Sequence, residues 1–448
     1  MSLEKLQKTL VYLTGIKLLG TRHSTYDSND NGWLRPLWIL WFAMLITMVG
    51  FGSVFPFLPL YLIELGITDS GKAALWSGVL GGVPALLMML TAPLWGVLGN
   101  RTGSKRNVIV GLLGFSSVYI AASSVPNFQT LLLVWPLLGM LPAPAMVAIP
   151  LIIGLVPQRK ITFSIGVLTS ATFLGFAMGP FLGGALIDQF GFRFVLLFTS
   201  VLLCLSGLTV LLFVKNDRQK HTDSTPLVLS SIYKDMLRPI RMGYLPIIFG
   251  LLFMIQSMSA FTMPVIPLLT AKLSLSIDAG LSAGIAFSIM GIMGGITSMF
   301  TSKIIELISS RNLILILLIT ASLINIPVLF IGDLIPFYII LGIIGACEGG
   351  LVTLIFAQIG LSSDSNRSAI YGASQSISAL AWALAPIIGG LAAGLWGLRE
   401  VFILQAVICI LGGFTAIILK YKFPETKIIP EVNDRQEFLP DPMPTGDS

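Results

Sequence analysis

Long apolar runs with almost no charge dominate this chain and limit what it can fold into. Only 11% of its 448 residues are charged and 55% are hydrophobic, whereas a soluble domain is usually about 25% charged. This chain has too few polar side chains to cover the surface of a soluble fold of this size. The pattern excludes a soluble enzyme, a nucleic-acid-binding module and a disordered scaffold. It predicts a membrane protein, in which each helical span needs roughly 20 apolar residues.

Hydropathy divides the chain into twelve apolar stretches joined mostly by short polar connections. We therefore expect an all-α membrane protein with twelve transmembrane helices, no cofactor and no metal. The expected spans are 37–63, 74–98, 107–125, 129–156, 163–187, 194–214, 244–271, 279–302, 313–332, 335–361, 369–395 and 401–419.

The basic residues indicate the orientation of these spans. All but four of the 27 Lys and Arg residues fall in connections on one side of the expected membrane. Because cytoplasmic loops carry the excess of Lys and Arg, both termini and the central loop are predicted to be cytoplasmic. Topology therefore accounts for the net charge of +6, and no nucleic-acid partner is expected. The four basic residues on the opposite side are Lys72, Arg193, Lys272 and Arg399.

An internal repeat relates the two halves of the chain. The segment that begins at Gly179 aligns with the segment that begins at Ala385, an offset of 206 that also pairs Pro180 with Pro386. Six spans in each half would give two parallel, pseudo-symmetric six-helix bundles. The predicted parts are an N-terminal arm (1–36), a first bundle (37–214), a central loop (215–243), a second bundle (244–421) and a tail (422–448). The arm fits either a helix lying on the inner leaflet or a loosely ordered segment.

The motif GFAMGPFLGG lies in the fifth expected span. Small residues at this spacing allow two helix backbones to approach closely, and an internal proline removes one helical hydrogen bond and permits a bend. Helix packing alone is the alternative explanation. The motif residues are Gly175, Gly179, Pro180, Gly183 and Gly184.

Two further motifs lie nearer the N-terminus. The first expected span contains FPFLPLYLIELG, and the connection between the second and third spans reads GVLGNRTGSKRN. The basic residues of this connection also fit a simple topology signal. The residues that carry the connection motif are Gly96, Asn100, Arg101, Gly103, Lys105 and Arg106.

Together these motifs resemble the major facilitator superfamily, in particular its twelve-span drug:proton antiporter branch. The resemblance implies that the fifth-span helix lies between the bundles and favours exchange over leak, and that the connection takes part in gating. Two positions differ from the branch. Asn100 stands where the family usually has aspartate, so it lacks a charge to interact with a helix dipole. Trp135 and Pro136 stand where the fourth span commonly carries an arginine implicated in proton coupling.

Glu348 is the ionisable residue expected nearest the middle of a span. It lies halfway along the tenth span, in LGIIGACEGGLVTL, and no basic residue falls inside any span. A charge at that depth costs several kcal/mol and is tolerated where it faces a cavity or a partner. We predict that Glu348 takes up and releases the proton that couples transport. The alternative is a permanently protonated Glu bonded to a neighbouring carbonyl or hydroxyl group.

Other polar and aromatic residues within the spans are candidates for a substrate cavity. Trp135 is placed to face Glu348, because the fourth and tenth spans are related by the repeat. Helix packing or helix–helix hydrogen bonding is the alternative for each. The candidates are Trp135, Gln256, Asn325, Gln358, Gln375 and Trp382.

The sequence therefore predicts a monomeric secondary active transporter in a bacterial inner membrane, and not an enzyme. It is expected to work by alternating access and to export small amphipathic compounds in exchange for protons. Two alternatives remain. One is a metabolite, amino-acid or siderophore carrier, as a uniporter or symporter, with the same fold. The other is a membrane sensor or scaffold that transports nothing.

Overall fold

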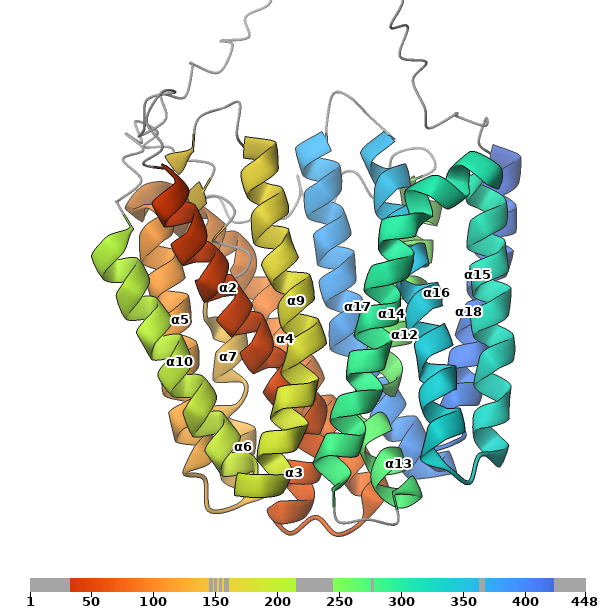
Figure 1. Ribbon diagram of the computed structural model, residues 1–448, viewed down its shortest axis with the longest axis horizontal. Helices are drawn as coiled ribbons and strands as arrows, with labels where there is room; N and C mark the ends of the chain where they lie inside the picture. Colours follow the sequence, from red (N-terminus) through yellow and green to blue (C-terminus); the bar gives the residue numbers. More distant parts are fainter. Residues whose placement is uncertain are drawn as a thin grey trace, which may run out of the picture.

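The computed structural model describes residues 33–144, 161–214, 245–274, 278–361 and 367–422, together with 148, 151, 152, 155 and 156. Within these residues the chain is helical and contains no strand. The predicted N-terminal arm, central loop and tail lie almost entirely outside the described residues. The helices run roughly parallel to one another, and their ends lie at two opposite faces of the molecule (Figure 1).

The helices of the first half of the chain lie on the left in Figure 1, and those of the second half lie on the right. Short 3-10 turns, η2 (Phe55–Phe57) and η5 (Ile326–Phe330), adjoin α2 and α15. In the first half the helices are α2 (Leu34–Val54), α3 (Leu58–Glu64), α4 (Ser70–Thr102), α5 (Ser104–Ser123), α6 (Phe128–Val134), α7 (Leu137–Met140), α9 (Ile161–Phe190) and α10 (Phe192–Phe213). In the second half they are α12 (Leu245–Thr262), α13 (Ile266–Leu273), α14 (Ala279–Leu307), α15 (Ser310–Asn325), α16 (Leu334–Leu361), α17 (Arg367–Trp396) and α18 (Val401–Lys422).

Helix length and composition make this a multi-pass membrane protein. Among the described residues, ten helical segments are long and apolar enough to cross a membrane. Two shorter apolar helices, Phe128–Met140 and Val401–Ile417, accompany them. Many side chains on the outside of the helices are large and apolar, and Leu212, Phe330 and Leu307 are each more than two-thirds exposed. Such a surface is suited to lipid rather than water.

The fourth expected span, 129–156, departs from a continuous helix. In the structure its first part consists of α6 and α7, separated at Trp135 and Pro136; the backbone is extended at Leu141, and the described residues from Pro144 to Leu155 are helical again. Pro136, Pro142 and Pro144 each lack a backbone N–H and resist the interior of a helix. Bonds from the N–H of Leu138 to the Trp135 carbonyl and of Gly139 to the Pro136 carbonyl close tighter turns here. A hydropathy window does not detect such a break, because proline interrupts the helix without adding polarity.

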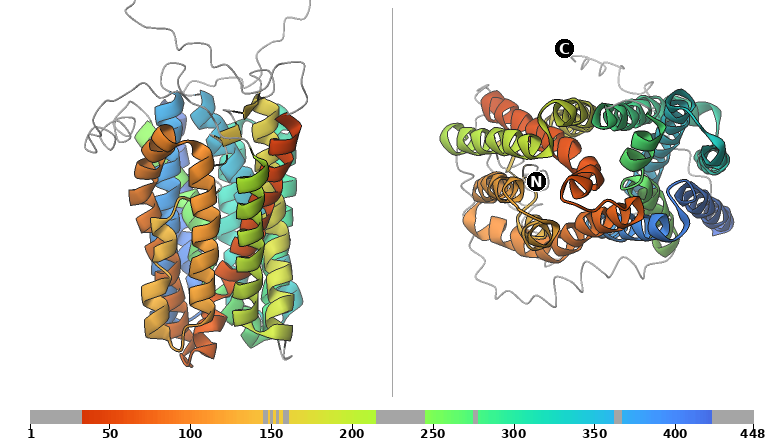
Figure 2. Two further views of the ribbon diagram at one scale, coloured as in Figure 1. Left: turned by 90° about the vertical axis from the view of Figure 1, so that its left-hand side faces the viewer. Right: turned by 90° about the horizontal axis from the view of Figure 1, so that it is seen from below.

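The short helices α3 and α13 touch across the two halves, but most of the contact between the halves is made by two helix pairs, α4 with α17 and α9 with α14. They lie side by side in the middle of the view in Figure 1, and the view from below in Figure 2 shows the same neighbours. We call these two contacts the seams. We call the end where α2 begins and α18 ends the upper end, and the end where α9 ends and α14 begins the lower end.

The seams are closed by glycines that touch backbone directly. Gly284 of α14 lies against the Pro180 carbonyl of α9, and Gly78 of α4 lies against the Pro386 carbonyl of α17. A Cβ atom at either glycine would collide with that backbone. Membrane helices associate through such close packing, because lipid supplies no hydrophobic force between them. These contacts all lie in the lower halves of the four helices.

Residues 206 positions apart make equivalent contacts. The pair Gly284 and Pro180 corresponds to Gly78 and Pro386 at this offset, and the same relation holds for hydrogen bonds. The Ser116 hydroxyl donates to the Ser200 carbonyl, and the Ser322 hydroxyl donates to the Ala406 carbonyl. Further equivalent pairs are Gly184 on the Gly280 carbonyl with Gly390 on the Ala74 carbonyl, and Ser288 near the Ala177 carbonyl with Gly82 near the Ala383 carbonyl.

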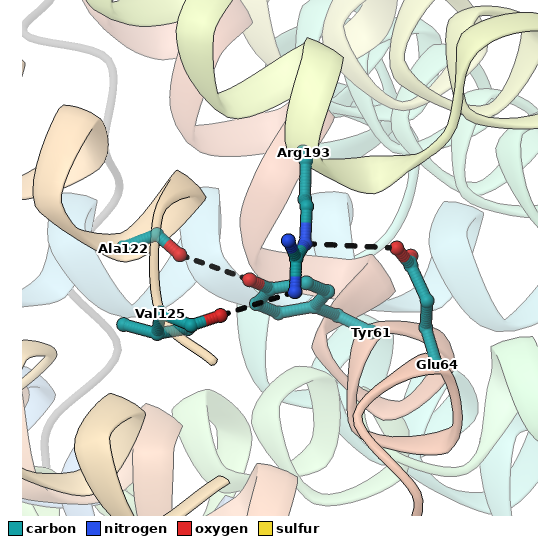
Figure 3. A network of polar contacts seen from close by, with 5 residues as sticks. All are labelled: Tyr61, Glu64, Ala122, Val125 and Arg193. Carbon is teal, nitrogen blue, oxygen red and sulfur yellow. Dashed lines mark hydrogen bonds and ion pairs between the residues drawn. The ribbon is translucent and has the colours of Figure 1, made fainter. Parts of the chain in front are cut away.

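Polar contacts at the lower end tie helix ends together (Figure 3). The Arg193 guanidinium donates to the Val125 carbonyl just after α5 and lies 4.0 Å from the Glu64 carboxylate at the end of α3. The Tyr61 hydroxyl donates to the Ala122 carbonyl. These donors satisfy carbonyl groups at the end of α5 that have no partner within the helix. In the second half, Arg399 similarly donates to the Leu329 carbonyl.

Within the first half, the glycines of the fifth-span motif pack against α2. Gly175, Gly179 and Gly183 face the α2 backbone near Val49, Gly52 and Ser53, and the Ser53 hydroxyl donates to the Gly179 carbonyl. Gly184 faces the other way, toward α14. The motif therefore lets α9 approach one helix on each side.

We predict that Gly179→Ala destabilises the protein. A Cβ atom there would lie 2.7 Å from the Val49 carbonyl oxygen and 2.9 Å from the Gly52 Cα, so α2 and α9 must separate. Overpacking of this kind costs about 1–3 kcal/mol and should lower the Tm of the purified protein in detergent. Gly413→Ala is the matched control, since nothing lies within 4 Å of its added Cβ. An unchanged Tm for Gly179→Ala would contradict the prediction.

Candidate functional site

Glu348 lies halfway along α16 and is buried, with 9% of its surface exposed. On either side of it, Gly345 and Gly349 press against the α14 backbone at Met290 and Gly294. This close helix packing holds the α16 backbone in place around the carboxyl group.

The carboxyl group of Glu348 lies near one polar side chain of another helix. This is Ser259, from the middle of the span formed by α12 and α13, whose hydroxyl interacts with the carboxyl group. One carboxyl oxygen, Oε1, has no hydrogen-bond partner among the described residues. A buried carboxylate oxygen without a donor is costly, so this atom is suited to carrying a proton. No Lys, Arg or His lies beside it in the described spans, as the sequence predicts.

Several predicted cavity residues lie on the helices around Glu348. Gln256 is one turn before Ser259 on α12 and is half-buried. Trp382 lies halfway along α17, as Glu348 does along α16, and is also half-buried. Gln375 occupies the same face of α17 two turns earlier and is exposed. Gln358 lies about three turns beyond Glu348 on α16 and is half-buried.

Trp135 is packed inside the first half of the protein. It is 1% exposed, and its ring stacks on Tyr119 of α5 with the centroids 5.9 Å apart. Its indole N–H has no hydrogen-bond partner among the described residues. In this conformation the structure does not bring Trp135 together with Glu348.

Asn325 is also fully buried, at the C-terminal end of α15. Its side-chain N–H donates to the Ala321 carbonyl one turn earlier, and its amide oxygen has no partner among the described residues. Because α15 packs on α16 and α18, Asn325 takes part in helix packing here.

The connection motif between α4 and α5 is almost all helix. Gly103 ends α4 with φ +94°, a conformation that suits glycine, and α5 starts at the next residue. The Lys105 ammonium donates to the Leu211 carbonyl near the end of α10, at 2.9 Å, where a positive charge complements the helix dipole. Arg106 is exposed. The side chains of Asn100 and Arg101, and the surroundings of Gly96, lie outside the described residues.

The sequence analysis missed three polar groups near this site, two of which are buried. Ser259 is the most important, because serine is common in membrane helices and carries no distinctive signal. Gln405 of α18 is fully buried and donates to the Met258 carbonyl, next to Ser259. Ser378 of α17 is buried and its hydroxyl has no partner among the described residues. The signal for Gln405 was present in the sequence, because it is a polar residue within an expected span, as Gln375 is.

Comparison with known proteins agrees with this architecture. Residues 40–360, well over half of the chain, match the family model of the Major Facilitator Superfamily. The chain belongs to this superfamily. It is therefore a membrane transporter and not an enzyme.

Individual relatives and solved structures give the same fold. The multidrug resistance protein MdtG of Proteus mirabilis is 28% identical over 388 residues, covering 85% of this chain and 94% of the relative. MdtG of Escherichia fergusonii is 28% identical over 389 residues, covering 86% and 94%. A bacterial homologue of the human lysosomal transporter Spinster superposes with a TM-score of 0.68 at 13% identity, covering 86% of this chain and 96% of that one. The human organic anion transporter MFSD10 superposes with a TM-score of 0.65 at 17% identity, covering 86% and 100%.

We predict that Trp135 contributes chiefly to stability in this conformation. Trp135→Ala should lower the free energy of unfolding by about 3–5 kcal/mol, because it removes a fully buried ring stacked on Tyr119. Trp135→Phe keeps an aromatic ring there and should retain most of the stability and transport. Thermal unfolding and transport measured on the same preparations check this. A Phe variant that is stable but does not transport would instead place the indole in the transport pathway.

Proposed function

We propose that this protein exports small amphipathic compounds across a bacterial inner membrane in exchange for protons. Its relatives named as multidrug resistance proteins support this substrate class. The protein is a monomer that works by alternating access, with a site near the membrane midplane that opens to each side in turn.

The observation that carries the proposal is the environment of Glu348. Its carboxyl group is buried halfway along α16 near Ser259, and its Oε1 has no hydrogen-bond partner among the described residues. An acid at this depth is costly unless it serves a pathway. Glu348 binds a proton when the site faces one side and releases it when the site faces the other. Substrate occupies the site in the deprotonated state, so one movement is exchanged for the other.

The proposed architecture has twelve spans in two six-helix bundles, residues 37–214 and 244–421. The ten long apolar segments and the two shorter apolar helices together supply twelve spans. The contacts repeated at an offset of 206 support a pseudo-symmetric pair of bundles. Rocking of the two bundles about the seams then exposes the midplane site alternately.

The distribution of basic residues assigns the upper end to the cytoplasm. Both termini, the central loop (215–243) and the α4–α5 connection then lie on the cytoplasmic side, as positive-inside topology requires. The backbone contacts at the seams lie in the lower halves of α4, α9, α14 and α17. They support a conformation closed toward the outside.

We propose that substrate contacts Gln256, Gln358, Gln375 and Trp382, which are exposed or half-buried on the helices around Glu348. Their amide groups and ring suit compounds that are apolar with a few polar atoms. Trp135 and Asn325 are buried here, so a contact between either residue and substrate stays a prediction for a conformation that exposes them. Among the gating residues, Lys105 holds the end of α10. Asn100 and Arg101 belong to the same connection.

Transport in proteoliposomes tests the role of Glu348. With an acidic interior and a neutral exterior, the unaltered protein should accumulate amphipathic fluorescent dyes as protons leave, and a protonophore should abolish the accumulation. Glu348→Gln keeps the size and polarity of the side chain but cannot release a proton. It should reduce uphill accumulation at least about tenfold while expression and Tm stay close to normal.

Asp333→Asn is the matched control, because Asp333 is an exposed acid just before the same helix, α16. It should transport normally. A Glu348→Gln variant that still accumulates dye to the normal level would refute the proposed coupling. If the unaltered protein only equilibrates dye down the dye's own gradient, at a rate that does not change when the proton gradient is collapsed, the result would point to a uniporter instead.

A further inference from the structure

Asp188 lies in the last turn of α9, at the lower end of the α9–α14 seam. Its two carboxylate oxygens accept hydrogen bonds from the backbone N–H groups of Gly280 and Leu281, at 2.9 Å and 2.6 Å. These two residues belong to the first turn of α14, in the other half of the chain. An acid of the first half therefore caps a helix of the second half.

We propose that Asp188 is a latch that holds the lower end of the protein closed, and that its release is a step in opening the protein to the outside. The inference rests on the proposed alternating access, since a latch has meaning only if this end opens.

The chemistry of the contact makes it strong for a surface interaction. The first N–H groups of a helix have no partner within the helix, and the positive end of the helix dipole lies there. A carboxylate that binds two such groups supplies charge-assisted hydrogen bonds, which are shorter and stronger than neutral ones. Parting α9 from α14 at this end breaks both bonds at once.

The N-terminus of α14 is capped by Asp188 and not by a residue of its own sequence. Asp278 occupies the position that normally caps α14, but its side chain makes no capping bond and is exposed. Helix α4, the repeat-related partner of α14, is capped differently. Its own Asp69 accepts from the Lys72 N–H at 2.7 Å. The cap of α4 therefore stays within one half of the protein, while the cap of α14 crosses the seam.

Glycines bring the two helices close enough for the carboxylate to reach. Gly184, one turn before Asp188, lies against the Gly280 carbonyl, and Gly280 in turn lies beside the Gly184 carbonyl and the Asp188 carboxylate. No side chain intervenes between the two backbones.

The repeat shows that this latch belongs to one seam. At the offset of 206 the counterpart of Asp188 is Gly394, which contacts Gly71 of α4 and has no side chain with which to cap. Among the described residues, the lower end of the α4–α17 seam is thus held by packing alone. Asp188 adds an electrostatic bond to the other seam, so loss of this bond shifts the balance between closed and open conformations.

Pulsed electron–electron double resonance in nanodiscs tests the latch. Spin labels are placed at Gln129 and Ile335, which are repeat-related, exposed and at the lower end of opposite halves. The three native cysteines, Cys204, Cys347 and Cys409, are replaced by alanine in this background. Opening of the lower end lengthens the distance between the labels.

Asp188→Ala should raise the ratio of open to closed protein at least about tenfold, because it removes both capping bonds. Asp188→Asn keeps one oxygen as an acceptor but loses the charge, and it should give a smaller shift of about threefold. The Asn variant also answers the question if the Ala variant does not fold. Asp278→Asn is the matched control, an acid at the same helix start that makes no capping bond, and it should leave the ratio unchanged.

Distance distributions for both Asp188 variants that match the unaltered protein would overturn the latch. An equal shift in Asp278→Asn would overturn it as well, since it would assign the effect to general charge at this end. If the unaltered protein and every variant stay closed while substrate and a low outside pH are applied, alternating access itself fails. A failure of the latch alone gives a different result: the unaltered protein opens under these conditions, and the Asp188 variants open to the same extent.

Discussion

Direct contact between helix backbones holds this protein together. In a membrane there is no hydrophobic force between helices, so association relies on close packing and hydrogen bonds. At both seams and between α2 and α9, glycines place one backbone against another, as at Gly284 with Pro180 and at Gly78 with Pro386. Such contacts can form and separate with little side-chain reorganisation, because no side chain lies between the two backbones. They suit surfaces that must part and rejoin.

The acids Glu348 and Asp188 have different surroundings, which fit the different roles proposed for them. Glu348 is buried among α12, α14 and α16, and one of its oxygens has no partner in the described part of the chain. Asp188 lies at a surface end, with both oxygens bonded to the start of α14. Helix α14 contacts both sites, since Gly294 and Met290 pack against α16 beside Glu348.

Much of the fold could be predicted from the sequence, because hydropathy and charge are local properties. The boundaries of most spans follow from them, and the repeat at an offset of 206 follows from direct comparison of the halves. The fourth span could not be predicted so well. Pro136, Pro142 and Pro144 break it into short helices, while a hydropathy average still registers a continuous apolar run.

Hydropathy and residue spacing were enough to predict that the chain is a membrane protein, which residues lie deep in it, and that Glu348 is an acid halfway along a span. Each of these depends only on composition and spacing along the chain. Tertiary structure alone decided which groups meet. It brought Ser259 near Glu348, stacked Trp135 on Tyr119, and placed Asp188 on a helix that begins about 90 residues later. Such contacts follow from how helices pack across a seam, and neither hydropathy nor spacing records which face of one helix touches which face of another.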